Sequence, residues 1–332
     1  MFQEAKEGGK VLCGLCSHRC LIADGKRGIC AVRENRGGVL YSLVYDRIIA
    51  QNIDPIEKKP LFHFQPGSRS YSIATPGCNF RCLHCQNADI SQLPRDHGGI
   101  LLGEGVQPSE IVKAAKNAGC TSISYTYTEP TIFFELAYET ARLAVEAGLK
   151  NVFVTNGYIT PKALETIRPY LHAANIDLKG FSDEFYKKVC GARLRPVLDA
   201  IGLYKKYGIW IEITTLIIPD HNDSEAELKQ IAGFIRSVGA DVPWHVTRFH
   251  PTYKLTEEPR TPLQTLKRAR EIGFEAGLRY VYEGNIPGEG EETACWSCRK
   301  PLVKRFGFSV EENNIRDGKC RFCGSPIDGV WS

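Results

Sequence analysis

The chain has 332 residues, 43% of them hydrophobic, and its 42 basic and 38 acidic residues leave a formal net charge of +4. This length suffices for one large domain with small additions, and the composition is that of an ordinary globular protein. The charge is too small to indicate nucleic-acid binding, and no apolar run approaches the ~20 residues that cross a bilayer. The opening residues lack the apolar core of a signal peptide, so we expect a cytoplasmic protein that does not associate with membranes.

The 13 cysteines carry the strongest compositional signal. All but Cys120 and Cys190 fall into three clusters. C-x2-C pairs in a chain without a secretion signal indicate metal or redox chemistry rather than disulfides. The two isolated cysteines are expected to be small buried hydrophobic residues.

The first cluster lies in residues 1–40, within CGLCSHRCLIADGKRGIC. A segment this short cannot build a core alone, so we expect a metal-binding module. The ligands are Cys13, Cys16, Cys20 and Cys30, or His18 in place of one cysteine. Zinc and an auxiliary [4Fe–4S] cluster both fit this set, and we prefer zinc. Residues 41–69 are expected to form strands and turns that connect this module to the next domain.

From residue 70 to about 290 the pattern alternates between short β-rich segments and amphipathic helices. The predicted strands are 70–75, 121–127, 151–155, 173–178, 209–217, 243–249 and 279–284. The predicted helices are 108–119 (with Ser109 as N-cap), 131–149, 161–170, 182–189, 194–206, 223–238 and 262–277. Regular alternation predicts an α/β fold with a parallel sheet. About six βα units fall short of the eight of a closed barrel, so we expect a partial (βα)6 barrel over 70–290. Its active site should lie at the carboxyl ends of the strands.

The stretch TPGCNFRCLHCQN, residues 75–87, follows the first of these strands and places three cysteines in a C-x3-C-x2-C pattern. Three thiolates suit an iron–sulfur cluster, and in a [4Fe–4S] cluster they would leave one iron open for chemistry. Cys78, Cys82 and Cys85 are therefore candidate catalytic and metal-binding residues. The alternative is a zinc knuckle that takes its fourth ligand from His84 or His63.

This motif, placed after the first strand of a βα domain, resembles the signature of the radical S-adenosylmethionine (radical SAM) superfamily. The resemblance implies that the open iron chelates the amino and carboxylate groups of SAM. It also implies that the cluster cleaves SAM reductively to a 5′-deoxyadenosyl radical, which abstracts hydrogen from a substrate. His84 occupies the family's aromatic position, where it would pack near the adenine.

At the end of the second strand, YTEPT resembles the family's GGEP-type motif, with Tyr127 and Thr128 in place of the two glycines. The resemblance implies that Glu129 binds the SAM amino group. The other interpretation is an acidic residue that the dipole favours at a helix N-terminus.

Further strand ends resemble segments of glycyl-radical-enzyme activases. FVTNG and DLK imply that Thr155, Asn156 and Asp177 lie near SAM and that Lys179, with Asp177, acts near a substrate peptide. Asn-Gly and Asp are also common in plain turns, which is the alternative. In the fifth-strand segment Glu212 stands where activases often have Arg, and it is a further candidate for cofactor binding. RFHP places His250 at the end of the sixth strand, where related activases contact the nucleoside.

The tail, residues 291–332, contains CWSC and CRFC with 21 residues between the two pairs. This spacing predicts a zinc-ribbon or rubredoxin-like module. We expect structural Zn²⁺ on Cys295, Cys298, Cys320 and Cys323. The alternative is a rubredoxin-type iron that relays electrons to the catalytic cluster, since both metals accept four thiolates.

Several motifs together resemble the AmmeMemoRadiSam-system branch of the superfamily, which is related to pyruvate formate-lyase activating enzymes. They are CGLCSHRC, EKKPLFHF, CNFRCLHCQN, TYTEPT and CRFCG. The resemblance implies an oxygen-sensitive oxidoreductase of anaerobic metabolism. A partner protein is a candidate substrate, and the companion proteins of that system are candidate partners. The expected electron donor is a ferredoxin or flavodoxin.

Two other function classes compete with this enzyme. Flanking cysteine modules and a pI of 8.3 would suit a metal-ribbon nucleic-acid-binding protein without SAM chemistry. However, its basic residues are scattered among acidic ones, and such a module does not need a large βα domain. A passive electron carrier would not need Glu129, Asp177 and His250 near the cluster. We therefore expect a radical SAM enzyme and do not expect nucleic acid as a partner.

Overall fold

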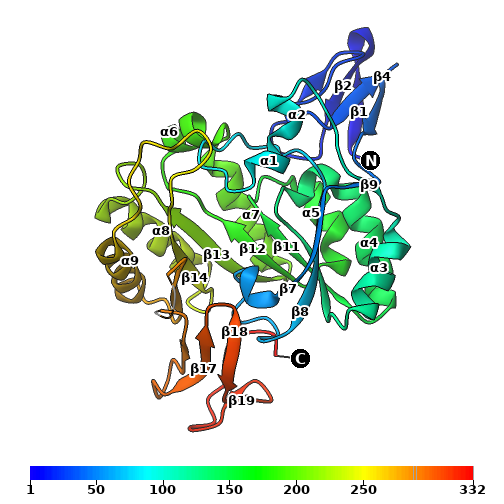
Figure 1. Ribbon diagram of the computed structural model, residues 1–332. Coiled ribbons are helices and arrows are strands. Elements are labelled where there is room, and N and C mark those ends of the chain that lie inside the picture. The colour runs from blue at the N-terminus through cyan, green and yellow to red at the C-terminus, as the bar shows by residue number, and fades with distance from the viewer. Residues whose placement is uncertain (287, 289, 332) are drawn as a thin grey trace.

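The computed structural model describes residues 1–286, 288 and 290–331 (Figure 1). The predicted ranges 70–290 and 291–332 also contain Pro287, Glu289 and Ser332, which lie outside the described residues. An eight-stranded sheet forms the centre, in the order β15-β14-β13-β12-β11-β10-β8-β7. Its strands are β7 (Ala50–Pro55), β8 (Arg69–Ala74), β10 (Ser122–Tyr125), β11 (Lys150–Thr155), β12 (Ala173–Asp177), β13 (Trp210–Ile217), β14 (Trp244–Arg248) and β15 (Val281–Gly284).

All strands of this sheet except β7 run parallel, and helices on the outer face connect each parallel strand to the next (Figure 1). The crossover helices are α3 (Pro108–Asn117), α4 (Phe134–Glu146), α5 (Pro161–Ile167), α7 (Leu194–Lys206), α8 (Glu225–Val238) and α9 (Leu263–Glu275). The two edge strands, β7 and β15, lie at opposite ends of the strand order, so the sheet is open. The predicted α/β class and partial barrel are confirmed.

Local details differ from the prediction at several ends. Ser109 is not an N-cap, because α3 already begins at Pro108. The N-cap is Gln107, whose backbone N–H donates to the Glu110 carboxylate at 2.8 Å. The predicted helix 182–189 is a short α6 (Asp183–Phe185) that continues as the π-helical turn η5 (Tyr186–Cys190). Short elements surround the predicted ones: α1 (Ala88–Ser91), α2 (Leu93–Asp96), and the 3₁₀ turns η1 (Glu7–Gly9), η2 (Ile56–Lys58), η3 (Pro130–Phe133) and η4 (Arg168–Tyr170).

The N-terminal module lies at the carboxyl ends of the parallel strands (Figure 1). Its three-stranded sheet contains β1 (Gln3–Lys6), β2 (Lys10–Cys13) and β3 (Leu21–Ile22), and its hairpin contains β4 (Arg33–Arg36) and β5 (Val39–Ser42). After the module, β6 (Arg47–Ile48) pairs with β9 (Glu104–Gly105). Cys16 forms a bridge with Ile159, and Thr160 N donates to Leu15 O at 3.1 Å. The module therefore joins the barrel at the loop that follows β11.

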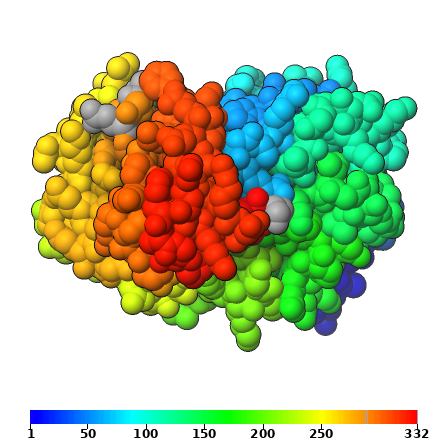
Figure 2. Space-filling view, turned by 90° about the horizontal axis from the view of Figure 1, so that it is seen from below, coloured from blue at the N-terminus to red at the C-terminus, as the bar shows by residue number. Residues whose placement is uncertain are grey.

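The C-terminal module covers the opposite end of the barrel, as Figure 2 shows from below. Its strands are β16 (Thr293–Ala294), β17 (Pro301–Phe306), β18 (Ser309–Asn313), β19 (Ile315–Arg316) and β20 (Lys319–Cys320). Val330 pairs with Phe64, and Arg279, just before β15, contacts Asp328 at 2.8 Å. The two cysteine modules thus occupy opposite ends of the sheet.

All 13 cysteines lie in the described part of the chain, and all are free thiols. Cys120 and Cys190 are buried, as predicted. Among the described residues, no helix combines the length and apolar character that a bilayer span requires.

Candidate active site

The Cys78 loop, residues 75–87, leaves the carboxyl end of β8 and carries the three-cysteine motif. Cys82 is buried, and Cys78 and Cys85 are half-buried. The thiols receive local polar contacts: Phe80 N donates to Cys78 Sγ at 3.4 Å, and Ser91 Oγ lies 3.1 Å from Cys85 Sγ. Burial, together with the negative charges of Glu129 and Cys82, raises the pKa of Cys78 well above its ordinary value. A cation bound among these sulfurs would reverse that effect.

Two buried polar atoms beside these thiols lack hydrogen-bond partners. They are Asn79 Nδ2 and His84 Nδ1. The His84 ring stacks on Phe185 with a centroid distance of 6.4 Å. Buried polar groups are normally satisfied, so orphaned ones next to three thiolates fit a site that receives a polar group. The residues present therefore fit an iron–sulfur cluster with a cofactor bound to it.

The alternative ligand His63 does not reach this loop. It lies at the other end of the barrel, where its ring contacts Asp328 O at 2.7 Å and Tyr282 Oη at 2.6 Å. A zinc knuckle that uses His63 is therefore excluded by the fold.

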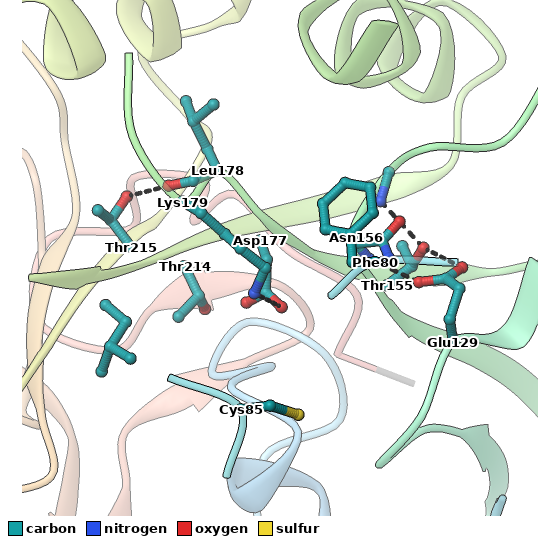
Figure 3. A network of polar contacts seen from close by, with 12 residues as sticks. Phe80, Cys85, Glu129, Thr155, Asn156, Asp177, Leu178, Lys179, Thr214 and Thr215 are labelled. Carbon is teal, nitrogen blue, oxygen red and sulfur yellow. Dashed lines mark hydrogen bonds and ion pairs between the residues drawn. The ribbon is translucent and has the colours of Figure 1, made fainter. Parts of the chain in front are cut away.

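Glu129 is the centre of a buried hydrogen-bonded group (Figure 3). Its Oε1 accepts from Thr155 Oγ1 at 2.8 Å and from Thr131 N at 3.0 Å, and its Oε2 accepts from Asn156 N at 2.8 Å. Burial raises the pKa of Glu129, while these hydrogen bonds oppose the rise. Glu129 is also the N-cap of η3, as the helix-terminus interpretation of this residue expects. Binding of the SAM amino group by Glu129 stays a prediction.

Tyr127, which stands where the family motif has a glycine, adopts a backbone conformation that favours glycine. Its φ is +61°, in the left-handed region. Three contacts hold it there: Asn87 Nδ2 donates to its carbonyl at 2.8 Å, its hydroxyl donates to Asp54, and the Lys59 ammonium lies 4.5 Å from its ring centroid. The missing glycine is thus compensated by side-chain contacts.

Asn156 links the Glu129 group to the Cys78 loop. Its Nδ2 donates to Asn79 Oδ1 at 2.8 Å, and its Oδ1 accepts from Tyr158 N at 3.0 Å. Gly157 follows with φ +71°, and a Cβ there would lie 3.0 Å from Ile176 Cγ2. The structure therefore brings the predicted residues Glu129, Thr155 and Asn156 together, beside Cys78.

Asp177 and Lys179 form a second group at the end of β12 (Figure 3). Lys179 Nζ lies 2.9 Å from Asp177 Oδ2, and the Lys179 and Asp177 side chains are 16% and 33% exposed. Burial opposes the charge of Lys179, but Asp177 and Cys82 outweigh it and raise its pKa well above the ordinary value. A charged ammonium thus lies near the Cys78 loop and is partly exposed.

Glu212 does not lie at this rim, and its prediction as a cofactor-binding residue is wrong. It lies near the amino end of β13, fully buried, and its carboxylate accepts from His63 N at 2.8 Å. It also contacts His245 Nε2 at 2.7 Å. Strand periodicity could not reveal this, because an inward residue at either end of a parallel strand has the same pattern. His250 does follow β14 at the rim and is half-buried.

The structure adds residues that sequence reasoning missed. Asn79 lies inside the motif and contacts Asn156, and Thr214 is the register partner of Asp177 on β13. The Cys190 thiol interacts with Cys82. The position of Asn79 within the motif was a usable signal, whereas nothing in the sequence relates Cys190 to Cys82.

The C-terminal quartet forms a compact metal-binding geometry. The sulfurs of Cys295, Cys298, Cys320 and Cys323 all lie within 4.8 Å of one another. Two of the separations are 3.7 and 3.8 Å. Backbone N–H groups of the two knuckles point at Cys295 and Cys320. This site can hold one tetrahedral metal ion.

Comparisons with known proteins agree with this geometry. The profile described as "Radical SAM superfamily" matches residues 72–232. An uncharacterized protein of Methanocaldococcus jannaschii is 48% identical, over 99% of this chain and 98% of its own. A second protein of that organism, named as a putative glycyl-radical enzyme activating enzyme, is 26% identical over 62% of this chain and 78% of its own.

Among solved structures, Streptococcus suis SuiB bound to S-adenosylmethionine resembles this fold with a TM-score of 0.52. The likeness covers 69% of this chain and 53% of SuiB, at 15% sequence identity. The profile match, together with the three-cysteine loop at the carboxyl end of the first parallel strand, shows that this chain contains a radical SAM domain.

Proposed function

We propose that this chain is a radical SAM oxidoreductase of the activating-enzyme type. The observation that carries the proposal is the Cys78 loop, where three thiols lie beside the orphaned Asn79 Nδ2 and His84 Nδ1. A [4Fe–4S] cluster held by Cys78, Cys82 and Cys85 would supply reductive cleavage of SAM to a 5′-deoxyadenosyl radical. The family assignment favours this function over a nucleic-acid-binding protein or a passive electron carrier.

The chain's own residues would divide the binding work. Glu129 joins the segments after β10 and at the end of β11 through Thr155 and Asn156, and Asn156 holds them against the Cys78 loop. His84 offers a flat ring for the adenine, and half-buried His250 offers a second ring at the rim. Preorganised groups of this kind orient a cofactor without rearrangement.

The proposed substrate is a segment of a partner protein. Relatives named as activating enzymes support this class, and so does the Asp177–Lys179 pair, which is partly exposed at the rim. Hydrogen would be abstracted from the segment, with Lys179 positioning its backbone carbonyls. Companion proteins of the AmmeMemoRadiSam type are the first to test, and a true substrate should stimulate 5′-deoxyadenosine formation. Ferredoxin or flavodoxin is the proposed reductant, and the free thiols fit a reducing cytoplasm.

The test is SAM binding by anaerobically reconstituted protein. Wild type should bind about one labelled SAM per chain in equilibrium dialysis, whereas Cys82→Ala should bind none, because two thiolates cannot hold the cluster. Cys120→Ala is the matched control, since Cys120 is buried just before β10, at the far end of that strand from the loop. Unchanged SAM binding by Cys82→Ala would overturn the proposal.

A further inference from the structure

The N-terminal quartet lines a single cavity. Cys13, Cys16, Cys20 and Cys30 face it together with apolar walls from Leu15, Ile22, Ile29 and Ile132. Because zinc binds thiolate sulfur at about 2.3 Å, four thiolates around one tetrahedral zinc lie about 3.8 Å apart. The C-terminal quartet meets that spacing, with separations of 3.7 and 3.8 Å. Among the described residues, the ligand atoms of the C-terminal quartet all lie within 4.8 Å of one another, whereas those of the N-terminal quartet do not. The N-terminal sulfurs surround a space instead.

A buried cation faces this cavity. Arg33 is 2% exposed and lines the cavity, and its Nε has no hydrogen-bond partner. Its Nη2 is paired with Glu135, which leaves Nε as the unsatisfied donor. An unsatisfied buried N–H is costly, so Arg33 Nε is a donor that an acceptor bound among the cysteines would satisfy. Bridging sulfides of a cluster are such acceptors, and hydrogen bonds to sulfur are a recognised feature of iron–sulfur sites.

His18 is not a substitute ligand through its outer nitrogen. His18 Nε2 lies 2.8 Å from Asn79 O, where it donates to a carbonyl. Its ring contacts Tyr158 at 4.7 Å, and Tyr158 contacts Phe80 at 5.2 Å. Through Nε2 the histidine therefore connects the module to the Cys78 loop, and we take the four cysteines as the ligands.

The two cysteine loops also touch through their backbones. A Cβ at Gly77 would lie 3.1 Å from Cys30 O and 2.6 Å from Val32 Cγ1, so glycine is required there. Arg95 Nη2 donates to Ile29 O at 2.9 Å and to Cys78 O at 3.4 Å. An occupant of the cavity would thus lie next to the Cys78 loop.

We propose that Cys13, Cys16, Cys20 and Cys30 bind an iron–sulfur cluster of the [4Fe–4S] type, and not the zinc that the sequence favoured. Four cysteine ligands close its coordination, so it binds no SAM. Its place beside Gly77 suits a carrier that accepts one electron from a ferredoxin- or flavodoxin-class donor and is reoxidised by the neighbouring site. The inference goes beyond the proposed function: binding of the cluster does not depend on SAM chemistry, and only its role as an electron carrier rests on the proposed function.

The test removes the other cluster site and leaves this one intact. After anaerobic reconstitution, wild type should contain about eight acid-labile sulfides per chain, since each [4Fe–4S] cluster has four. The triple variant Cys78→Ala/Cys82→Ala/Cys85→Ala should keep about four sulfides and a dithionite-reducible EPR signal that SAM does not alter. The double variant Cys13→Ala/Cys16→Ala should instead lose the four sulfides of the N-terminal cluster and keep the four of the Cys78 loop. Sulfide is counted because a rubredoxin-type iron contains none.

The outcomes separate the two proposals. A triple variant without sulfide that carries two zinc ions per chain would overturn this inference and leave the proposed function standing. If the triple variant contains as much sulfide as wild type, the Cys78 loop holds no cluster, and that result would instead contradict the proposed function. Should Cys13→Ala/Cys16→Ala fail to fold, the triple variant alone decides, because its N-terminal module is unaltered.

Discussion

At the scale of single residues, the account depends on how the Glu129 carboxylate is used. It accepts from a backbone N–H and a hydroxyl through Oε1 and from a second backbone N–H through Oε2. These donors come from η3 and from the loop after β11, so one side chain fixes two segments of the rim. A fully buried carboxylate is tolerated there because several donors surround it.

Replacing Glu129 by Gln tests this role. The amide would present an N–H₂ group to donors that need an acceptor, so we expect a loss of about 1–3 kcal/mol in the free energy of unfolding and weaker SAM binding. Urea unfolding and equilibrium dialysis measure the two effects. The exposed Glu184→Gln is the control and should change neither. Wild-type stability in Glu129→Gln would show that the network is not stabilising.

His63 makes stability depend on pH. Burial lowers its pKa from 6.5 to about 4, with Glu212 opposing this and Arg305 and His245 adding to it. The unfolded chain therefore takes up a proton below about pH 6.5 that the folded chain refuses, and stability falls as the pH falls. Between about pH 7 and 5.5 we expect a loss of about 1 kcal/mol from this group. Denaturation midpoints at the two pH values measure it, and His63→Gln should flatten the dependence. Equal slopes in both proteins would contradict the assignment.

At the scale of elements, the turn after β11 controls how the rim is assembled. Gly157 has a φ of +71°, and a Cβ added there would lie 3.0 Å from Ile176 and 3.3 Å from Val197. A side chain there would press on Ile176 and Val197, directly after the residue that contacts both Glu129 and Asn79. The turn is therefore specified by sterics as well as by hydrogen bonds.

Gly157→Ala should destabilise the protein by about 1–3 kcal/mol and weaken SAM binding, because strain and contact act together. Gly202→Ala in α7 is the matched control. Its Cβ would meet open space, so it should stabilise by about 0.4–1 kcal/mol. Thermal denaturation of both variants measures the contrast, and a neutral Gly157→Ala would contradict it.

The elements of the barrel could be predicted from sequence, whereas the positions of side chains along them could not. The apolar pattern located β8, β10 to β15, α3 to α5 and α7 to α9, because the strands are largely buried and each of these helices buries one apolar face. Glu212 was misplaced because its buried carboxylate depends on Phe62 and His63 N–H groups far away in sequence. Likewise β7 joins the sheet by antiparallel pairing that its mixed polar composition does not signal.

At the scale of the whole molecule, the two cysteine modules have different positions and so different expected roles (Figures 1 and 2). The N-terminal module contacts the Cys78 loop. The C-terminal module lies at the opposite end of the sheet, docked through His63 and Asp328. Electrons from its metal would have to cross the barrel, so a structural ion is the better account of this site.

Cys298→Ser tests that account. The variant should lose about one zinc per chain and melt at a lower temperature, since a structural zinc site contributes folding energy. Metal analysis and thermal denaturation measure these effects. The iron content and sulfide content of the variant should equal those of wild type. Its rate of SAM cleavage, measured at low temperature, should also be unchanged. A selective loss of SAM cleavage, with iron instead of zinc at the site, would indicate an electron relay.

The most direct measurement of the central claim is release of 5′-deoxyadenosine. Anaerobically reconstituted wild type and Cys82→Ala are each incubated with SAM and dithionite, and the product is quantified by chromatography. We predict release from wild type and none above background from the variant. Equal release from both proteins, or a wild-type chain that takes up no iron and releases no product, would contradict the assignment of radical SAM chemistry to the Cys78 loop.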